Sequence, residues 1–139
     1  MSPERCLVID ECLDKRLAAE LANRGRAAHS AQFLGLLGLE DPDVIARLAE
    51  ILPDCVLVTA DDNLPATHRV YVDRAHLTVA TIDGRRPPRW VSDEPWRRDV
   101  VHRWAHRMAE QPPGSRRRYG LSVQEWSARR RKLRLATRG

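Results

Sequence analysis

Three short apolar and β-branched runs stand out along the chain, and an acidic residue stands within two positions of the end of each. The runs span residues 6–9, 55–59 and 77–82. Continuous apolar runs of this length are typical of strands that are buried on both faces of a parallel sheet. Residues 26–33 predict a further short strand.

Between these strands, apolar residues recur three and four positions apart, which is the spacing of one buried helix face. Asp14 is suited to cap the first helix, and Gly25 is suited to end it. Asp41 is predicted as the N-cap of the second helix, with Pro42 in its first position. The pattern predicts helices over residues 14–25, 41–52, 93–110 and 122–133.

The alternation of strands with helices predicts an α/β fold, a three-layer α/β/α sandwich around a mostly parallel sheet. Residues 84–92 hold two prolines and three arginines, which is typical of a linker. We therefore predict an acidic α/β core over residues 1–84 and a C-terminal Arg-rich helical extension over residues 85–139. The end of this extension is expected to fray.

Composition narrows the class of protein. The chain has 139 residues, enough for one compact domain or a small domain with a tail. No apolar run approaches the roughly 20 residues of a membrane span, so no membrane association is expected. The first residues do not resemble a signal peptide, and three cysteines without a C-x-x-C pair favour reduced thiols. We expect a cytoplasmic protein.

Charge is distributed unevenly along the chain. The net charge of +5 combines −6 over residues 1–83, from 8 basic and 14 acidic side chains, with +11 over residues 84–139, from 16 basic and 5 acidic ones. Most of the basic residues are arginines, whose planar guanidinium binds phosphate oxygens in pairs. Parts of opposite sign suggest nucleic acid or an acidic protein as a partner.

Acidic residues follow all three clear strands: Asp10, Asp61 and Asp83. In parallel α/β folds, ligands bind beyond the carboxyl ends of the strands. Carboxylates gathered there suit Mg²⁺ or Mn²⁺, which can support phosphodiester hydrolysis. The simpler alternative is a helix cap for Asp41 and a solvated turn for Asp62 and Asp83.

The segments LVIDE, EDPDVIARLAE and VLVTADDNLP, in this order, resemble the PIN-domain ribonucleases, especially the short PIN-like proteins of bacterial toxin–antitoxin pairs. The resemblance covers more than half of the chain. Asp10 matches the family's first acid, and Asp41 matches the acid that opens a helix. Thr59 and Asp61 match its Thr-x-Asp pair, whereas Asn63 stands where a further acid is usual.

This resemblance implies a Mg²⁺- or Mn²⁺-dependent endoribonuclease that is a toxin held by an antitoxin. Its implied catalytic residues are Asp10, Asp41 and Asp61, which would also bind the metal together with Asn63. Asn63 keeps a carbonyl oxygen but gives up a charge, which should weaken binding of a second metal. Residues implied to shape the site are Thr59, Glu11, Asp62 and Asp83.

The basic part contains two arginine clusters, Arg116, Arg117 and Arg118, and Arg129, Arg130 and Arg131. With Tyr119 and Trp126 nearby, they are candidates to grip a sugar-phosphate backbone and stack a base. The alternatives are a solvated tail, packing on the acidic part, or docking of an acidic antitoxin segment. Trp96 and Trp104 share a helix face, which predicts a core or a homodimer interface.

Two other functions fit the same residues. One is a catalytically dead PIN-like module that binds nucleic acid, with Asn63 marking the lost activity. The other is an interaction protein whose acidic and basic halves pair between protomers. Metal-dependent turnover separates the first from the ribonuclease, and salt-sensitive self-association without nucleic-acid affinity would identify the second.

Overall fold

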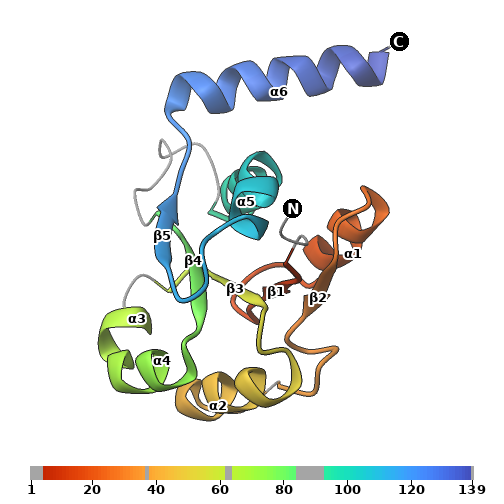
Figure 1. The fold of residues 1–139 in the computed structure, drawn as a ribbon. Helices are drawn as coiled ribbons and strands as arrows, with labels where there is room; N and C mark the ends of the chain where they lie inside the picture. The colour runs from red at the N-terminus through yellow and green to blue at the C-terminus, as the bar shows by residue number, and fades with distance from the viewer. Residues whose placement is uncertain (1–4, 37, 62–63, 84–92, 139) are drawn as a thin grey trace.

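The computed structural model describes residues 5–36, 38–61, 64–83 and 93–138. Within them, five strands form one sheet in the order β2-β1-β3-β4-β5, and all neighbouring strands are parallel. Helices cover both faces, which confirms the predicted α/β class (Figure 1). The elements are β1 (Leu7–Ile9), α1 (Arg16–Asn23), β2 (Ala28–Ser30), α2 (Asp41–Ile51), β3 (Val56–Thr59), α3 (Leu64–Thr67), α4 (Arg69–Ala75), β4 (Thr78–Ile82), α5 (Asp93–Ala109), β5 (Arg116–Tyr119) and α6 (Val123–Arg138).

The strands divide the core in two because successive side chains point to opposite faces of the sheet. In β1, Leu7 and Ile9 pack with α1 and α5, while Val8 packs with α2 and α4. All three side chains are fully buried. Burial of each such side chain contributes about 1.5–3 kcal/mol, so β1 anchors both layers.

The strands predicted at 6–9, 55–59 and 77–82 are confirmed, each one residue shorter, whereas the strand predicted over 26–33 is limited to Ala28–Ser30. The start of α2 differs by one residue from the prediction. Its N-cap is Glu40, in an extended conformation, so Asp41 is the first helical residue and Pro42 the second. The Asp41 carboxylate, freed from the predicted capping position, lies 3.3 Å from His68 Nε2.

Strand β5 was not predicted, because three consecutive arginines do not have the apolar pattern of a strand. It is an edge strand that pairs with β4, and edge strands often carry charged side chains that discourage pairing with other chains. Tyr119 ends β5 and is buried; its hydroxyl donates to Gln111 Oε1 at 2.9 Å. Elements on either side of the predicted boundary between residues 84 and 85 therefore share one sheet.

Helix α6 is longer than predicted and lies across α5, at the top of Figure 1. Its Trp126 ring is 6.5 Å from that of Trp96, which is buried in the α5 layer as predicted for a core residue. The linker predicted at residues 84–92 lies outside the described residues. Within the described part of the chain, every helix is too short or too polar to span a lipid bilayer.

Candidate functional site

Thr59 links two of the predicted site residues at the carboxyl edge of the sheet. It is the last residue of β3 and is fully buried. Its hydroxyl donates to Asp10 Oδ2 at 2.7 Å and accepts the backbone N–H of Asp61 at 3.1 Å. The end of β1 is therefore fixed against the turn that follows β3.

The Asp10 carboxylate has a partner on each oxygen. Oδ1 accepts the backbone N–H of Glu11 at 2.8 Å, and the Cys12 thiol lies 3.5 Å from Oδ2. The Glu11 side chain is exposed, so this residue shapes the site through its amide. The Cys12 sulfur in turn accepts the N–H of Ala60 at 3.5 Å, which closes the turn around Asp10.

Asp41 belongs to the same group of carboxylates, although it lies on α2. Burial raises the pKa of Asp41, and the negative charges of Asp10 and Asp61 raise it further, while His68 opposes them. Charges influence one another strongly only when they are close, because water screens them. The fold thus brings the three predicted catalytic carboxylates, Asp10, Asp41 and Asp61, into one electrostatic cluster.

This cluster suits a hard divalent cation in its chemistry but does not enclose one. Mg²⁺ and Mn²⁺ prefer oxygen ligands, and the mutual repulsion of these carboxylates would be relieved by a cation. In the described ranges, however, no group of three or more His, Cys, Asp or Glu side chains is placed to hold a metal ion. The predicted site residues Asp62 and Asn63 lie outside those ranges.

Asp83 follows β4 and is half-buried. Its backbone N–H donates to the carbonyl of Tyr119 at 2.7 Å. A Cβ added at Gly120 would lie 3.2 Å from the Asp83 Cβ, so the chain just after β5 passes close to this side chain. Asp83 is therefore held at the junction of β4 and β5.

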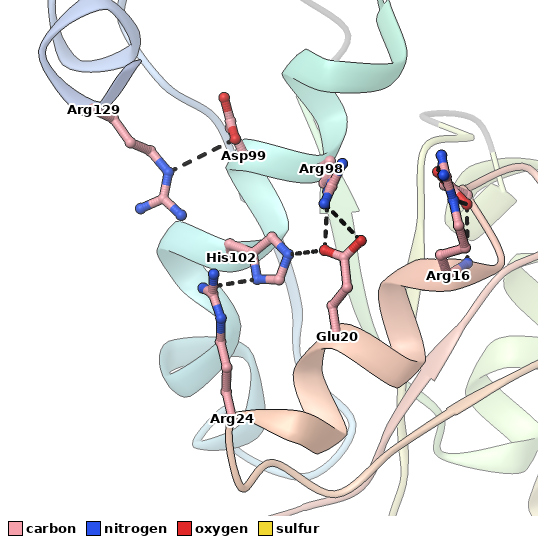
Figure 2. A network of polar contacts seen from close by, with 8 residues as sticks. Arg16, Glu20, Arg24, Arg98, Asp99, His102 and Arg129 are labelled. Atoms are coloured by element: carbon pink, nitrogen blue, oxygen red, sulfur yellow. Dashed lines mark hydrogen bonds and ion pairs between the residues drawn. The ribbon is translucent and has the colours of Figure 1, made fainter. Parts of the chain in front are cut away.

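The two predicted arginine clusters have different environments. Arg116, Arg117 and Arg118 are exposed on β5, and Arg116 forms an ion pair with Asp73 of α4. On α6, the Nε atoms of Arg129 and Arg130 lie 3.8 and 2.9 Å from the carboxylate of the buried Asp99. Arg131 is exposed. The second cluster thus holds α6 to α5 through two of its members, of which Figure 2 shows Arg129 beside Asp99.

The aromatic residues predicted to stack bases are turned inward. Tyr119 is buried and bonded to Gln111. Trp126 is half-buried and packs against the core beside Trp96. Both rings contribute apolar contacts to the α5 layer, and base stacking by the partly buried Trp126 stays a prediction.

Three features of this region were not predicted from the sequence. Cys12 lies two positions after Asp10, which is a weak signal for a contact. His68 is seven residues after Asp61 and was not connected with Asp41 by any pattern. A pocket of about 320 Å³ lies between the beginnings of α1 and α5, and only the tertiary fold forms it.

No protein-family model matches the chain, and comparisons with curated proteins and with solved structures give no significant match.

Proposed function

We propose that this protein is a PIN-like, Mg²⁺- or Mn²⁺-dependent endoribonuclease. The observation that carries the proposal is the shared electrostatic environment of Asp10, Asp41 and Asp61 at the carboxyl edge of a parallel sheet. Burial and the negative charges of Asp10 and Asp61 raise the pKa of Asp41, so the ionised form of Asp41 is unfavourable in the fold, and a bound cation would offset this cost.

In this proposal Asp10, Asp41 and Asp61 hold the cation, and Asn63 adds a neutral oxygen ligand. Such a cation, when bound, polarises a phosphoryl oxygen and lowers the pKa of a water molecule. The chain's own residues orient the ligands. Thr59 fixes one oxygen of Asp10 through its hydroxyl, and His68 Nε2 lies 3.3 Å from the Asp41 carboxylate.

RNA binding in this proposal rests on the exposed arginines. Arg118 precedes Tyr119 at the end of β5 and thus lies towards the edge of the sheet that carries the carboxylates. Arg131 is exposed on α6. We further propose that the protein acts as a homodimeric toxin in the cytoplasm, held by an antitoxin whose acidic segment competes with RNA for these arginines.

The test is cleavage of a mixed-sequence RNA with and without added Mn²⁺. Asp61→Asn should reduce metal-dependent cleavage at least 100-fold because it removes one anionic ligand. Asp54→Asn is the matched control, since Asp54 is exposed before β3. Circular dichroism verifies that both variants fold. Undiminished cleavage by folded Asp61→Asn protein would reject the proposal.

A second candidate is a catalytically dead PIN-like module that binds RNA. It is favoured by the finding that the carboxylates, in the part of the chain that is described, do not close around a metal ion. Tight RNA binding that is independent of Mn²⁺, with no turnover, would support it over the ribonuclease.

The third function considered, pairing of acidic and basic halves between protomers, competes with contacts inside the chain. Arg98 binds Glu20 at 2.8 Å, and Arg116 pairs with Asp73. Asp99 forms an ion pair with Arg130 of α6. These acidic residues are already matched within one chain, so we do not favour this function.

A further inference from the structure

The contact between α5 and α6 contains buried polar atoms that have no hydrogen-bond partner. Among the described residues, all the buried side-chain nitrogen and oxygen atoms without such a partner lie on these two helices. They are Trp96 Nε1, Asp99 Oδ2, Trp126 Nε1, Arg129 Nε and Arg130 Nε. A buried polar atom without a partner is costly because it has lost its hydrogen bonds to water. The polar groups of α6 are therefore poorly satisfied in the position that α6 takes on α5.

Asp99 holds two arginines of α6 by charge rather than by well-formed hydrogen bonds. Arg130 Nε lies 2.9 Å from Asp99 Oδ2, and Arg129 Nε lies 3.8 Å from Asp99 Oδ1, yet both N–H groups lack a hydrogen-bond partner. Burial lowers the pKa of Arg129, and the positive charges of neighbouring arginines lower it further, while Asp99 opposes them. The charged Arg129 guanidinium is consequently less favourable here than in water.

Apolar contact keeps α6 on α5 in the free protein. The Trp126 ring lies 6.5 Å from the ring of Trp96, which is 5% exposed, and Trp126 is packed against the core. The unpaired polar atoms around this contact oppose the gain from burying the two rings. We therefore expect α6 to be held weakly, so that a ligand with a modest preference for the released helix displaces it.

Helix α6 carries its own stabilising contacts. It is the last element of the fold, it is connected to β5 by residues 120–122, and it takes no part in the sheet. Ser122 Oγ accepts the N–H of Glu125 at 3.0 Å, and Glu125 Oε1 accepts the N–H of Ser122 at 3.3 Å, which is a reciprocal N-terminal cap. The Arg130 guanidinium lies 5.4 Å from the centre of the Trp126 ring. All of these contacts stay with α6 when it leaves α5.

The charge of α6 identifies the partner that it fits. Six of its 16 residues are basic and one is acidic. Phosphate oxygens accept hydrogen bonds from arginine in pairs, so an RNA backbone offers Arg129 and Arg130 the hydrogen bonds that Asp99 does not supply. These bonds favour the released helix over the docked one. We propose that α6 is an RNA-binding helix that RNA displaces from α5, and that Asp99 retains Arg129 and Arg130 while RNA is absent.

This inference rests on the RNA binding of the proposed function but not on cleavage. The full-length protein is titrated with a mixed-sequence single-stranded RNA in the presence of a chelator, and NMR follows the exchange of the tryptophan indole N–H groups with water. The indole N–H of Trp96 should exchange at least about tenfold faster with RNA bound, because Trp126 leaves the neighbouring position.

Trp104 is the control on the same helix. Its Nε1 donates to the carbonyl of Gly120 at 2.8 Å, outside the contact with α6, so its exchange should not change. Continued protection of Trp96 in protein saturated with RNA would overturn the proposal, as would absence of RNA binding.

Asp99→Asn tests the retaining contact directly. It should tighten RNA binding about fivefold, a typical coupling between two linked equilibria, because no carboxylate competes with phosphate for the arginines. Glu110→Gln is the matched control, since it removes the same charge at an exposed position just beyond the end of α5 and should change the affinity little. An equal gain in both variants, or no gain in Asp99→Asn, would contradict the proposal.

A second variant separates release from a merely structural role of Asp99. Arg129→Gln combined with Arg130→Gln loosens the same contact but removes the groups that bind phosphate, so it should weaken RNA binding. If Asp99 only supported the fold, Asp99→Asn and the double arginine variant would weaken binding alike. Fluorescence anisotropy at one salt concentration measures all of these affinities.

The outcomes also distinguish the partner and the two proposals. Faster exchange of Trp96 with poly-glutamate but not with RNA would identify an acidic protein as the partner and overturn the proposal. Release of α6 by RNA without metal-dependent cleavage would support the inference and reject the ribonuclease. Metal-dependent cleavage by a protein in which Trp96 stays protected would reject release of α6 alone.

Discussion

The hydroxyl of Thr59 donates to Asp10 Oδ2 at 2.7 Å across two neighbouring parallel strands, and the two residues are 49 positions apart in the chain. The same hydroxyl accepts the N–H of Asp61. One buried oxygen thus holds a carboxylate in place and fixes the backbone of a second acidic residue. The geometry of the candidate site depends on this contact.

Thr59→Val should therefore destabilise the protein. Valine has nearly the same shape as threonine, but the Asp10 carboxylate and the Asp61 amide each lose a hydrogen-bond partner. A loss of about 1–3 kcal/mol in the free energy of unfolding is expected, measured by urea denaturation. Thr59→Ser, which keeps the hydroxyl, should lose much less. Equal stability of the valine and serine variants would show that the hydroxyl is not structural.

Asp41→Asn should stabilise the metal-free protein at neutral pH. The pKa of Asp41 is raised by burial and by neighbouring carboxylates, so its ionised form is less favourable in the folded state than in the unfolded state. This penalty is present above the raised pKa and disappears as the pH falls through it. Thermal unfolding in the presence of a chelator should give a higher Tm for Asp41→Asn at pH 7.

Asp43→Asn is the control for that experiment. Asp43 also lies in the first turn of α2 but is exposed, so both variants lose the same favourable interaction with the helix dipole. If both variants change the Tm equally, repulsion within the carboxylate cluster is not the cause.

Protonation of His102 should lower the free energy of unfolding as the pH falls below about 6.5. Its Nε2 lies 2.7 Å from Glu20 Oε2 and its Nδ1 lies 3.2 Å from the Arg24 guanidinium (Figure 2). A neutral ring with its proton on Nε2 satisfies both contacts. Burial lowers the pKa of His102, the charges of Arg24 and Arg129 lower it further, and Glu20 opposes them.

The unfolded state consequently binds more protons than the folded state just below pH 6.5, and stability falls as the pH decreases there. Urea denaturation at pH 7.5, 6.5 and 5.5 measures this slope. His102→Gln should flatten it, whereas His29→Gln should not, because His29 is exposed on β2. An unchanged slope in His102→Gln would assign the pH dependence to other groups.

Asp99→Asn should loosen α6. Asp99 is 5% exposed and neutralises Arg129 and Arg130, whose charges would otherwise remain partly buried without a counter-charge. We expect a loss of about 1–3 kcal/mol, less than for a fully buried pair because both arginines reach solvent. Trypsin should cleave within α6 faster in this variant. Gln124→Ala, an exposed change on α6, should leave the cleavage rate nearly unchanged.

Arg118→Ala should weaken RNA binding without a large effect on stability. Arg118 is exposed at the end of β5, and loss of one phosphate contact should lower the salt dependence of binding by about one unit. Arg47→Ala, an exposed change on α2 beside Glu50, is the control. Fluorescence anisotropy at several salt concentrations measures both, and an equal loss of affinity in the two variants would indicate nonspecific attraction.

A deletion that tests the role of α6 has to leave β5 in the sheet. A deletion from residue 112 would remove β5 together with α6, and Gln111 would lose its partner Tyr119. A deletion from residue 122 would remove α6 and leave all five described strands. Only the second deletion separates the contribution of α6 from the integrity of the sheet.

The amino-acid sequence by itself determined the alternation of strands and helices and the position of Asp10, Thr59 and Asp61 at strand ends. These features are local, because a buried strand is a short apolar run and the residue that follows it must lie at the sheet edge. The parallel sheet follows from the same pattern, since helices between strands carry the chain back to the same edge.

Tertiary structure alone decided the rest. Strand β5 has no apolar pattern, and it forms because its backbone pairs with the neighbouring strand β4. The contact of His68 with Asp41, the ion pairs of Asp99 and the pocket between α1 and α5 join residues that are 27 to more than 80 positions apart. Such contacts depend on how helices pack against the sheet, which no short stretch of sequence encodes. The two arginine clusters show this most directly, because one lies exposed along a strand and the other mainly holds a helix in place.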